Sequence, residues 1–166
     1  MLARTGIPVG NLYLDITETV LVDDINVTMQ TVKALNKLGL RLVVDDFGTG
    51  YSSLRYLRRF PIAILKINRS FVEGLGSDRD DETLVKAVIG LARALGIVVV
   101  AKGVETALQD SHLIELGCAL AQGFHYGGGL DPVEAERRLT QVRAALYGPI
   151  SHAGRTGLKG CPPAGG

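Results

Sequence analysis

Two adjacent aspartates, Asp45 and Asp46, begin the segment whose residue types are best suited to chemistry. They follow the apolar run RLVV and precede FGTGYSSL, in which Gly48 and Gly50 permit a tight loop. Adjacent carboxylates can bind a hard divalent cation, because the metal offsets their shared charge. A solvated loop would use the same residues, so residue chemistry alone leaves both interpretations open.

Other polar residues stand at the C-terminal ends of apolar runs in the same way. They are Asp15, Lys66, Lys102 and Gln122. Active sites of parallel α/β proteins lie at the carboxyl ends of the strands. The sequence therefore predicts that five successive strands direct these side chains, together with the two aspartates, into one site.

The elements that must position these residues alternate between two patterns. Runs rich in branched residues predict strands over 12–17, 40–46, 62–68, 97–102 and 119–124. Apolar residues three and four apart predict helices over 25–38, 53–59, 82–95, 108–116 and 132–146. This alternation is typical of βα units around a parallel sheet.

A closed barrel of this type has eight strands and about 250 residues. We therefore expect an α/β fold, a partial (β/α)8 TIM-type barrel of about five βα units with parallel strands. The expected domain covers residues 1–146. Residues 147–166 are rich in glycine and proline, which predicts a disordered tail.

Composition sets limits on partners and location. The 166 residues are 46 % hydrophobic and 21 % charged, as in a globular domain. A net charge of +1 gives no footprint for a DNA or RNA polymer or an anionic membrane. No segment has the ~18 apolar residues of a membrane span. Two cysteines without metal-ligand or disulfide spacing suit a reducing, cytoplasmic location.

Four motifs in order resemble the EAL-domain family, bacterial phosphodiesterases that hydrolyse cyclic di-GMP. They are DDFGTGYSSL, LKINRSF, AKGVET and GCALAQGF, within residues 2–139. The resemblance implies a (β/α)8 barrel holding two Mg²⁺ or Mn²⁺ ions. In the family, a metal-activated water linearises the dinucleotide to pGpG.

The resemblance also implies roles for individual residues. Asp45 and Asp46 match the paired metal-binding aspartates of the family. Lys66 matches a lysine that orients a water or phosphate oxygen. Gln122 matches the glutamine at the last strand, and Glu18 matches a glutamate that anchors the glycine-rich loop. We therefore expect Lys66, Glu18 and Gln122 in the catalytic machinery.

Three positions depart from the family pattern. Asp15 replaces a metal-binding glutamate with a shorter carboxylate, and Asn68 replaces an aspartate with a neutral acceptor. Lys102 replaces the first glutamate of AEGVE, a ligand of the second metal, and a cation there repels that metal. Glu105 matches the second glutamate of that motif, a supporting position. We expect metal at Asp45, Asp46 and Asp15, a weakened second site and impaired catalysis.

The family's first three strands should precede residue 12, so the chain resembles the C-terminal five-eighths of the domain. The strands over 12–17 and 119–124 would then be open edges, which predicts a homodimer or a partner chain. Two further hypotheses stay open. The chain is either a non-catalytic module that binds cyclic di-GMP or a protein, or the product of a truncated reading frame.

Overall fold

The computed structural model of the protein describes residues 6–20, 25–48 and 57–147. The chain divides into two compact units, residues 1–128 and residues 129–166. In the second unit, the described residues include helix α8 (Pro132–Tyr147). The helix predicted over 53–59 falls mainly outside the described residues, as does the tail predicted over 147–166.

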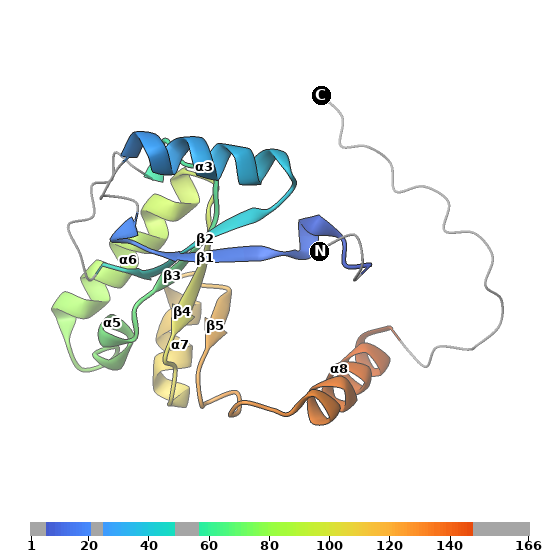
Figure 1. Cartoon of the computed structure of the whole chain (residues 1–166). Helices are drawn as coiled ribbons and strands as arrows, with labels where there is room; N and C mark the ends of the chain where they lie inside the picture. Colours follow the sequence, from blue (N-terminus) through green and yellow to red (C-terminus); the bar gives the residue numbers. More distant parts are fainter. Residues whose placement is uncertain (1–5, 21–24, 49–56, 148–166) are drawn as a thin grey trace. The chain divides into compact units, whose positions relative to one another are not determined.

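The first unit contains a five-stranded parallel sheet. Its strands are β1 (Tyr13–Thr17), β2 (Arg41–Phe47), β3 (Ile62–Ile67), β4 (Val98–Lys102) and β5 (Leu120–Gln122). The strand order in the sheet is the order in the sequence (Figure 1). Successive strands of a (β/α)8 barrel are arranged in this way. The predicted α/β partial barrel with parallel strands is confirmed.

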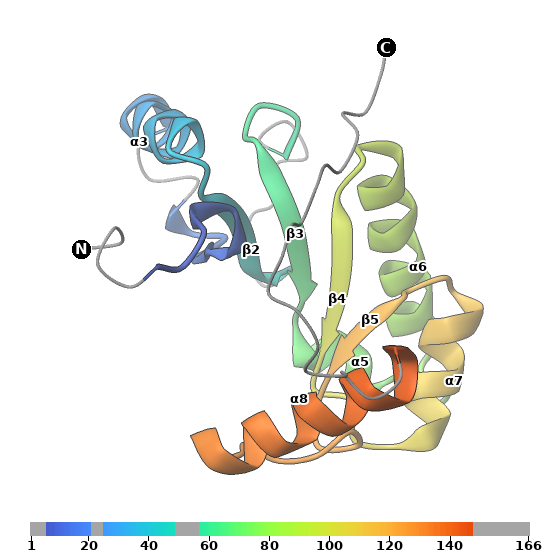
Figure 2. The same cartoon turned by 90° about the vertical axis from the view of Figure 1, so that its right-hand side faces the viewer.

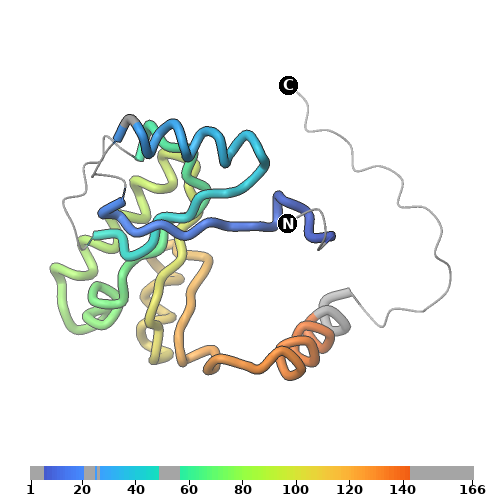
Figure 3. Tube along the Cα trace, in the orientation of Figure 1, coloured from blue at the N-terminus to red at the C-terminus, as the bar shows by residue number. Residues whose placement is uncertain are grey.

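Helices connect the strands, and the tube in Figure 3 shows this path along the chain. They are α3 (Ile25–Lys37), α5 (Arg69–Glu73), α6 (Arg79–Ala94) and α7 (Ala107–Glu115), with a 3₁₀ turn η1 at Val9–Asn11. Helix α6 begins three residues before its predicted start, because the Asp78 side chain accepts the Asp80 N–H at 2.8 Å and caps it. The sequence did not predict α5 or η1, since five residues or fewer show no helical period.

One face of the sheet, the helix-covered face, supplies the core. Its side chains Val44, Leu65, Ile67 and Ala101 are fully buried, and Figure 2 shows α6 lying along β3 and β4. The opposite, open face carries Tyr13, Val98 and Leu120, which are 46 %, 47 % and 47 % exposed. Because side chains alternate along a strand, the two faces draw on alternate residues of the same strands.

Strand β5 is shorter than the predicted 119–124, because the chain turns at Gly123. A Cβ atom at Gly123 would lie 2.0 Å from the carbonyl oxygen of Val104. The Val104 N–H donates to the Gln122 carbonyl at 3.1 Å, and the His125 N–H donates to the Val104 carbonyl at 3.0 Å. The close approach of the two backbones therefore requires glycine at this position. No helix in the described ranges is long and apolar enough to cross a membrane.

Candidate functional site

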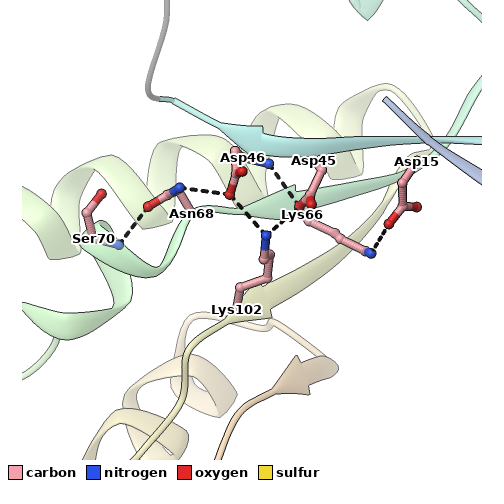
Figure 4. Close-up of polar contacts among 7 residues, drawn as sticks. All are labelled: Asp15, Asp45, Asp46, Lys66, Asn68, Ser70 and Lys102. Carbon is pink, nitrogen blue, oxygen red and sulfur yellow. Dashed lines mark hydrogen bonds and ion pairs between the residues drawn. The ribbon is translucent and has the colours of Figure 1, made fainter. Parts of the chain in front are cut away.

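The carboxyl ends of β1 to β4 bring together most of the predicted site residues. Asp15 lies on β1, Asp45 and Asp46 on β2, Lys66 on β3 and Lys102 on β4 (Figure 4). The register pairs Thr17 with Asp45 and Lys102 with Gln122, so the strand ends are level. Parallel pairing therefore gathers residues that lie far apart in the sequence.

Lys102 lies between the two aspartates. Its Nζ donates to Asp45 Oδ1 at 2.8 Å and to Asp46 Oδ1 at 3.0 Å. Burial lowers the pKa of Lys102, but its hydrogen bonds to the aspartates outweigh this and raise it. Burial likewise raises the pKa of Asp45, while hydrogen bonds from Lys102 and the Asp46 N–H bring it below its ordinary value. Both groups are therefore charged at neutral pH.

Lys66 and Asp15 form a second pair on the open face. The Lys66 Nζ lies 2.5 Å from Asp15 Oδ2, and the two side chains are 21 % and 46 % exposed. Lys66 was predicted to orient a water or phosphate, and Asp15 to bind metal. In this structure, each is the other's ionic partner.

The backbone of Asp46 has a left-handed conformation, with φ of 54°. Its side chain accepts a hydrogen bond from Asn68 Nδ2 at 2.8 Å. The Asn68 Oδ1 in turn accepts the Ser70 N–H at 2.8 Å and caps helix α5. The cap sets the orientation of the amide, because the oxygen must face α5 and the nitrogen must face Asp46.

Glu18 holds the start of the loop that follows the aspartates. It is 5 % exposed, and its Oε2 accepts the Gly48 N–H at 3.0 Å. Gly48 has φ of 103°, and a Cβ there would lie 2.6 Å from the ring of Phe71. This contact lies where the resemblance implies that a glutamate anchors the glycine-rich loop. Residues 49–56 of that loop are outside the described ranges.

Gln122 lies on β5, and Glu105 follows the end of β4. Gln122 is an exposed residue at the end of β5, beside Lys102 in the ladder. Glu105 Oε1 lies 3.0 Å from Arg69 Nη2. Arg69 also pairs with Glu73 and covers Gly103, where a Cβ would lie 2.3 Å from Arg69 Cγ. Sequence reasoning missed this role of Arg69, although its i,i+4 spacing from Glu73 was a usable signal.

The residues present do not fit a pair of metal ions as they are arranged. Asp45 and Asp46, the predicted metal ligands, both bind the Lys102 ammonium, and Asp15 binds Lys66. Within the described residues, no group of three His, Cys, Asp or Glu side chains is placed to hold a metal ion. The Lys102 ammonium thus lies against both predicted metal ligands of β2, and the Lys66 ammonium lies against the predicted ligand of β1.

Comparison with known proteins bears on the family of the chain. The bifunctional diguanylate cyclase/cyclic di-GMP phosphodiesterase MucR of Pseudomonas aeruginosa is 40 % identical over 141 residues. That match covers 85 % of this chain and 20 % of MucR. This chain thus spans about one fifth of the length of that relative.

Solved structures show the same relation. The EAL domain of Mycobacterium smegmatis DcpA is 43 % identical with a TM-score of 0.79, over 84 % of this chain and 63 % of that one. The complex of Klebsiella pneumoniae BlrP1 with manganese and cyclic di-GMP is 33 % identical with a TM-score of 0.71, over 75 % of this chain and 32 % of that one. The EAL domain model matches residues 1–128. This protein belongs to the EAL-domain family.

Proposed function

We propose that this chain is an EAL-type domain of bacterial cyclic di-GMP signalling in which metal-dependent hydrolysis to pGpG is impaired. The observation that carries the proposal is the Lys102 ammonium, which is hydrogen-bonded to both Asp45 and Asp46. Family membership and the phosphodiesterase named MucR support the choice of substrate. BlrP1 in complex with manganese and cyclic di-GMP supports a divalent metal as the family's cofactor, and the cofactor that we propose is Mg²⁺ or Mn²⁺.

Electrostatics gives the reason for the impairment. Two unit charges about 4 Å apart interact by about 4 kcal/mol at an effective dielectric of 20. A carboxylate at position 102 would attract a metal bound to Asp45 and Asp46, whereas the ammonium of Lys102 repels it. The raised pKa of Lys102 keeps that charge in place at neutral pH. Even the part of this repulsion that remains after solvent screening disfavours two-metal catalysis.

The remaining site residues keep the roles that the resemblance implies, as part of the proposal. Asp45, Asp46 and Asp15 are the carboxylates that would hold a metal ion if the lysines released them, and Lys66 would then orient a water or phosphate oxygen. Glu18 positions the loop after the aspartates through Gly48. Gln122 faces the substrate from the exposed end of β5.

A second candidate function is metal-free binding of cyclic di-GMP. It is favoured by the presence of two ammonium groups, Lys66 and Lys102, on one partly exposed face. An ammonium has three N–H donors, and two of those on Lys102 meet the aspartates. The third N–H of Lys102 could therefore donate to a phosphate oxygen without a metal ion, against the formal net charge of −1 of the two lysines and three aspartates.

The edge strands β1 and β5 are the surface at which we propose that a partner binds. Tyr13 and Leu14 on β1 are 46 % and 39 % exposed, and Leu120 on β5 is 47 % exposed. We propose that a homodimer or a partner chain covers these strands, since unpaired edges with apolar side chains favour pairing. Light scattering of the purified chain tests this, and a monomeric mass at all concentrations contradicts the homodimer.

The buried free thiol of Cys118 suits the proposed cytoplasmic location.

The proposed function is tested by measuring binding and hydrolysis separately. Equilibrium dialysis with labelled cyclic di-GMP, in EDTA and in Mn²⁺, measures binding, with GMP as the control nucleotide. Chromatography of the same mixtures measures pGpG. We expect binding without turnover. Metal-dependent turnover by the unaltered chain contradicts the impairment, and failure to bind in both conditions contradicts the assignment to cyclic di-GMP.

The variant Lys102→Glu sharpens the test. It restores the carboxylate that the family pattern has at this position and should increase Mn²⁺-dependent turnover or Mn²⁺-dependent binding. Lys86→Glu is the matched control, because Lys86 is an exposed lysine of α6 on the other side of the sheet. An equal response of the two variants would mean that position 102 does not govern metal use.

A further inference from the structure

Two carboxylate oxygens converge on one nitrogen atom at the site. Asp45 Oδ1 and Asp46 Oδ1 lie 2.8 and 3.0 Å from the Lys102 Nζ, and Figure 4 shows both side chains turned toward it. Lys102 reaches them from β4, across β3, which lies between β4 and β2 in the sheet. Lys102 therefore links β4 to β2, two strands that are not neighbours in the sheet.

The backbone of Asp46 creates this convergence. Adjacent residues of a strand point to opposite faces, so Asp45 and Asp46 would normally diverge. The φ of 54° at Asp46 and the break in register between Val44 and Phe47 end the alternation. Such a conformation is costly for a residue other than glycine. Two like charges brought together in this way need a cation close by.

Asn68 completes the surroundings of Asp46. Its Nδ2 donates to Asp46 Oδ1, the same oxygen that accepts from Lys102. Because the cap of α5 occupies the Asn68 oxygen, only the amide nitrogen can face the aspartate. An aspartate at 68 would instead direct a third carboxylate toward the pair. Asn68 and Lys102 are thus consistent with each other, since both supply donors where metal ligands would supply acceptors.

We propose that the Lys102 ammonium is a built-in cation that takes the place of a divalent metal between Asp45 and Asp46, so that this site forms without metal. A divalent cation would lie about 2.0–2.6 Å from the same oxygens. It cannot bind there while the ammonium nitrogen is at 2.8 and 3.0 Å, so the two compete for one position. The inference concerns the protein without ligand and does not depend on cyclic di-GMP.

The thermal midpoint of unfolding, measured in EDTA and in Mn²⁺, tests the proposal. A ligand that binds only the folded state raises the midpoint. The unaltered chain should show the same midpoint in both. Lys102→Met removes the charge and keeps an unbranched apolar chain. In EDTA, its midpoint should fall by roughly 3–6 °C, because two carboxylates lose their partner. Mn²⁺ should recover a large part of that loss.

Two further variants keep the test decisive. Asp45→Asn combined with Lys102→Met removes one of the two carboxylates that shared Lys102 and so relieves their repulsion. Its midpoint should lie above that of Lys102→Met in EDTA and respond less to Mn²⁺. Lys86→Met makes the same change on the exposed side of α6. Its thermal midpoint should equal that of the unaltered chain both in EDTA and in Mn²⁺.

A direct measurement covers the case in which Lys102→Met does not fold in EDTA. The electron paramagnetic resonance signal of free Mn²⁺ decreases when the ion binds protein. The unaltered chain should leave this signal unchanged. Mn²⁺ binding that is lost in Asp45→Asn would overturn the proposal, as would a Lys102→Met midpoint equal to that of the unaltered chain in EDTA.

Discussion

The two faces of the sheet meet different physical demands, although they share the same strands. On the helix-covered face, Leu65 and Ile67 are fully buried by helices that the chain itself supplies. On the open face, Val98 and Leu120 are nearly half exposed, and charged side chains occupy the strand ends. Apolar packing thus determines which residues the helix-covered face can hold, and charge pairing determines which residues the strand ends of the open face can hold.

The helix-covered face stabilises the fold, whereas the open face distinguishes this member of the family. The helix-covered face needs only apolar side chains at alternate positions, which many sequences provide. The open face depends on particular pairs, Lys102 with Asp45 and Asp46 and Lys66 with Asp15. One substitution on this face changes the chemistry while leaving the fold in place.

Leucine truncation should give the largest contrast between the faces. Leu65→Ala leaves a cavity among buried side chains and should lower the free energy of unfolding by about 2–5 kcal/mol. Leu120→Ala, the same change at a site 47 % exposed, should cost under about 1 kcal/mol. Urea denaturation of both variants gives the two values. The small value applies at concentrations where the chain is monomeric, because the proposed homodimer would cover Leu120 and raise the cost of its truncation.

Asn68→Asp should have the next largest effect, within the polar site. The carboxylate still caps α5 through Ser70, but it directs negative charge at Asp46 instead of an N–H donor. We expect a loss of about 1.5–3 kcal/mol, as for other lost hydrogen bonds to charged groups. Asn68→Ser is the control, because serine keeps a cap and adds no charge. If both variants are equally stable in urea, repulsion at Asp46 is negligible.

The pH dependence of stability should reveal the charged pair. Asp45 has a folded pKa below its ordinary 3.8, so its stabilisation is present above that pH and lost as pH falls through the folded value. Lys102 has a folded pKa above 10.5, so its stabilisation is present below that pH and lost as pH rises through the folded value. The contribution of this pair to the thermal midpoint should therefore be level between these limits and decline beyond both.

Tyr126 also affects how the thermal midpoint falls at high pH, and a variant of it serves as the control. Burial, together with a hydrogen bond to Asp110 at 2.5 Å, raises the pKa of Tyr126 to about 12. Its stabilisation is therefore also lost at high pH. Tyr126→Phe removes that contribution, so the decline that remains belongs to other groups. If Lys102→Met in this background leaves the alkaline limb unchanged, Lys102 does not contribute to it.

Lys66→Met should have the smallest effect. Its ion pair is with Asp15, which is 46 % exposed, so solvent screens the pair, and its charge also helps to lower the pKa of Asp45. We expect a loss of under about 1 kcal/mol in urea denaturation. Lys102→Met should cost more, because its ammonium serves two carboxylates in a less exposed position. The reverse order would contradict the distinction between the two lysines.

Several features of the fold followed from residue patterns, because they depend on local periodicity. Branched apolar runs located all five strands within a few residues, and periods of three and four located α3, α6, α7 and α8. Helix α5 was missed because it is a single short turn. The end of β5 was misplaced because the close approach of Val104 to Gly123 joins residues from two different strand ends.

The candidate site divides in the same way. The motifs identified Asp45, Asp46 and Lys102 as strand-end residues, and they marked Lys102 as a departure from the family pattern. They did not reveal that Lys102 bridges the two aspartates or that Asn68 joins them. These contacts cross 22 to 57 residues of sequence, and no local pattern encodes them.

The sequence by itself determined the family, the order of the parallel strands and which charged residues stand at the strand ends. Local side-chain periodicity and the motifs carry that information. Only the tertiary structure decided which charges meet, because strand register and the left-handed backbone at Asp46 set the positions of the oxygens. Whether a carboxylate faces a lysine or a metal depends on distances of a few ångströms between strands far apart in the chain.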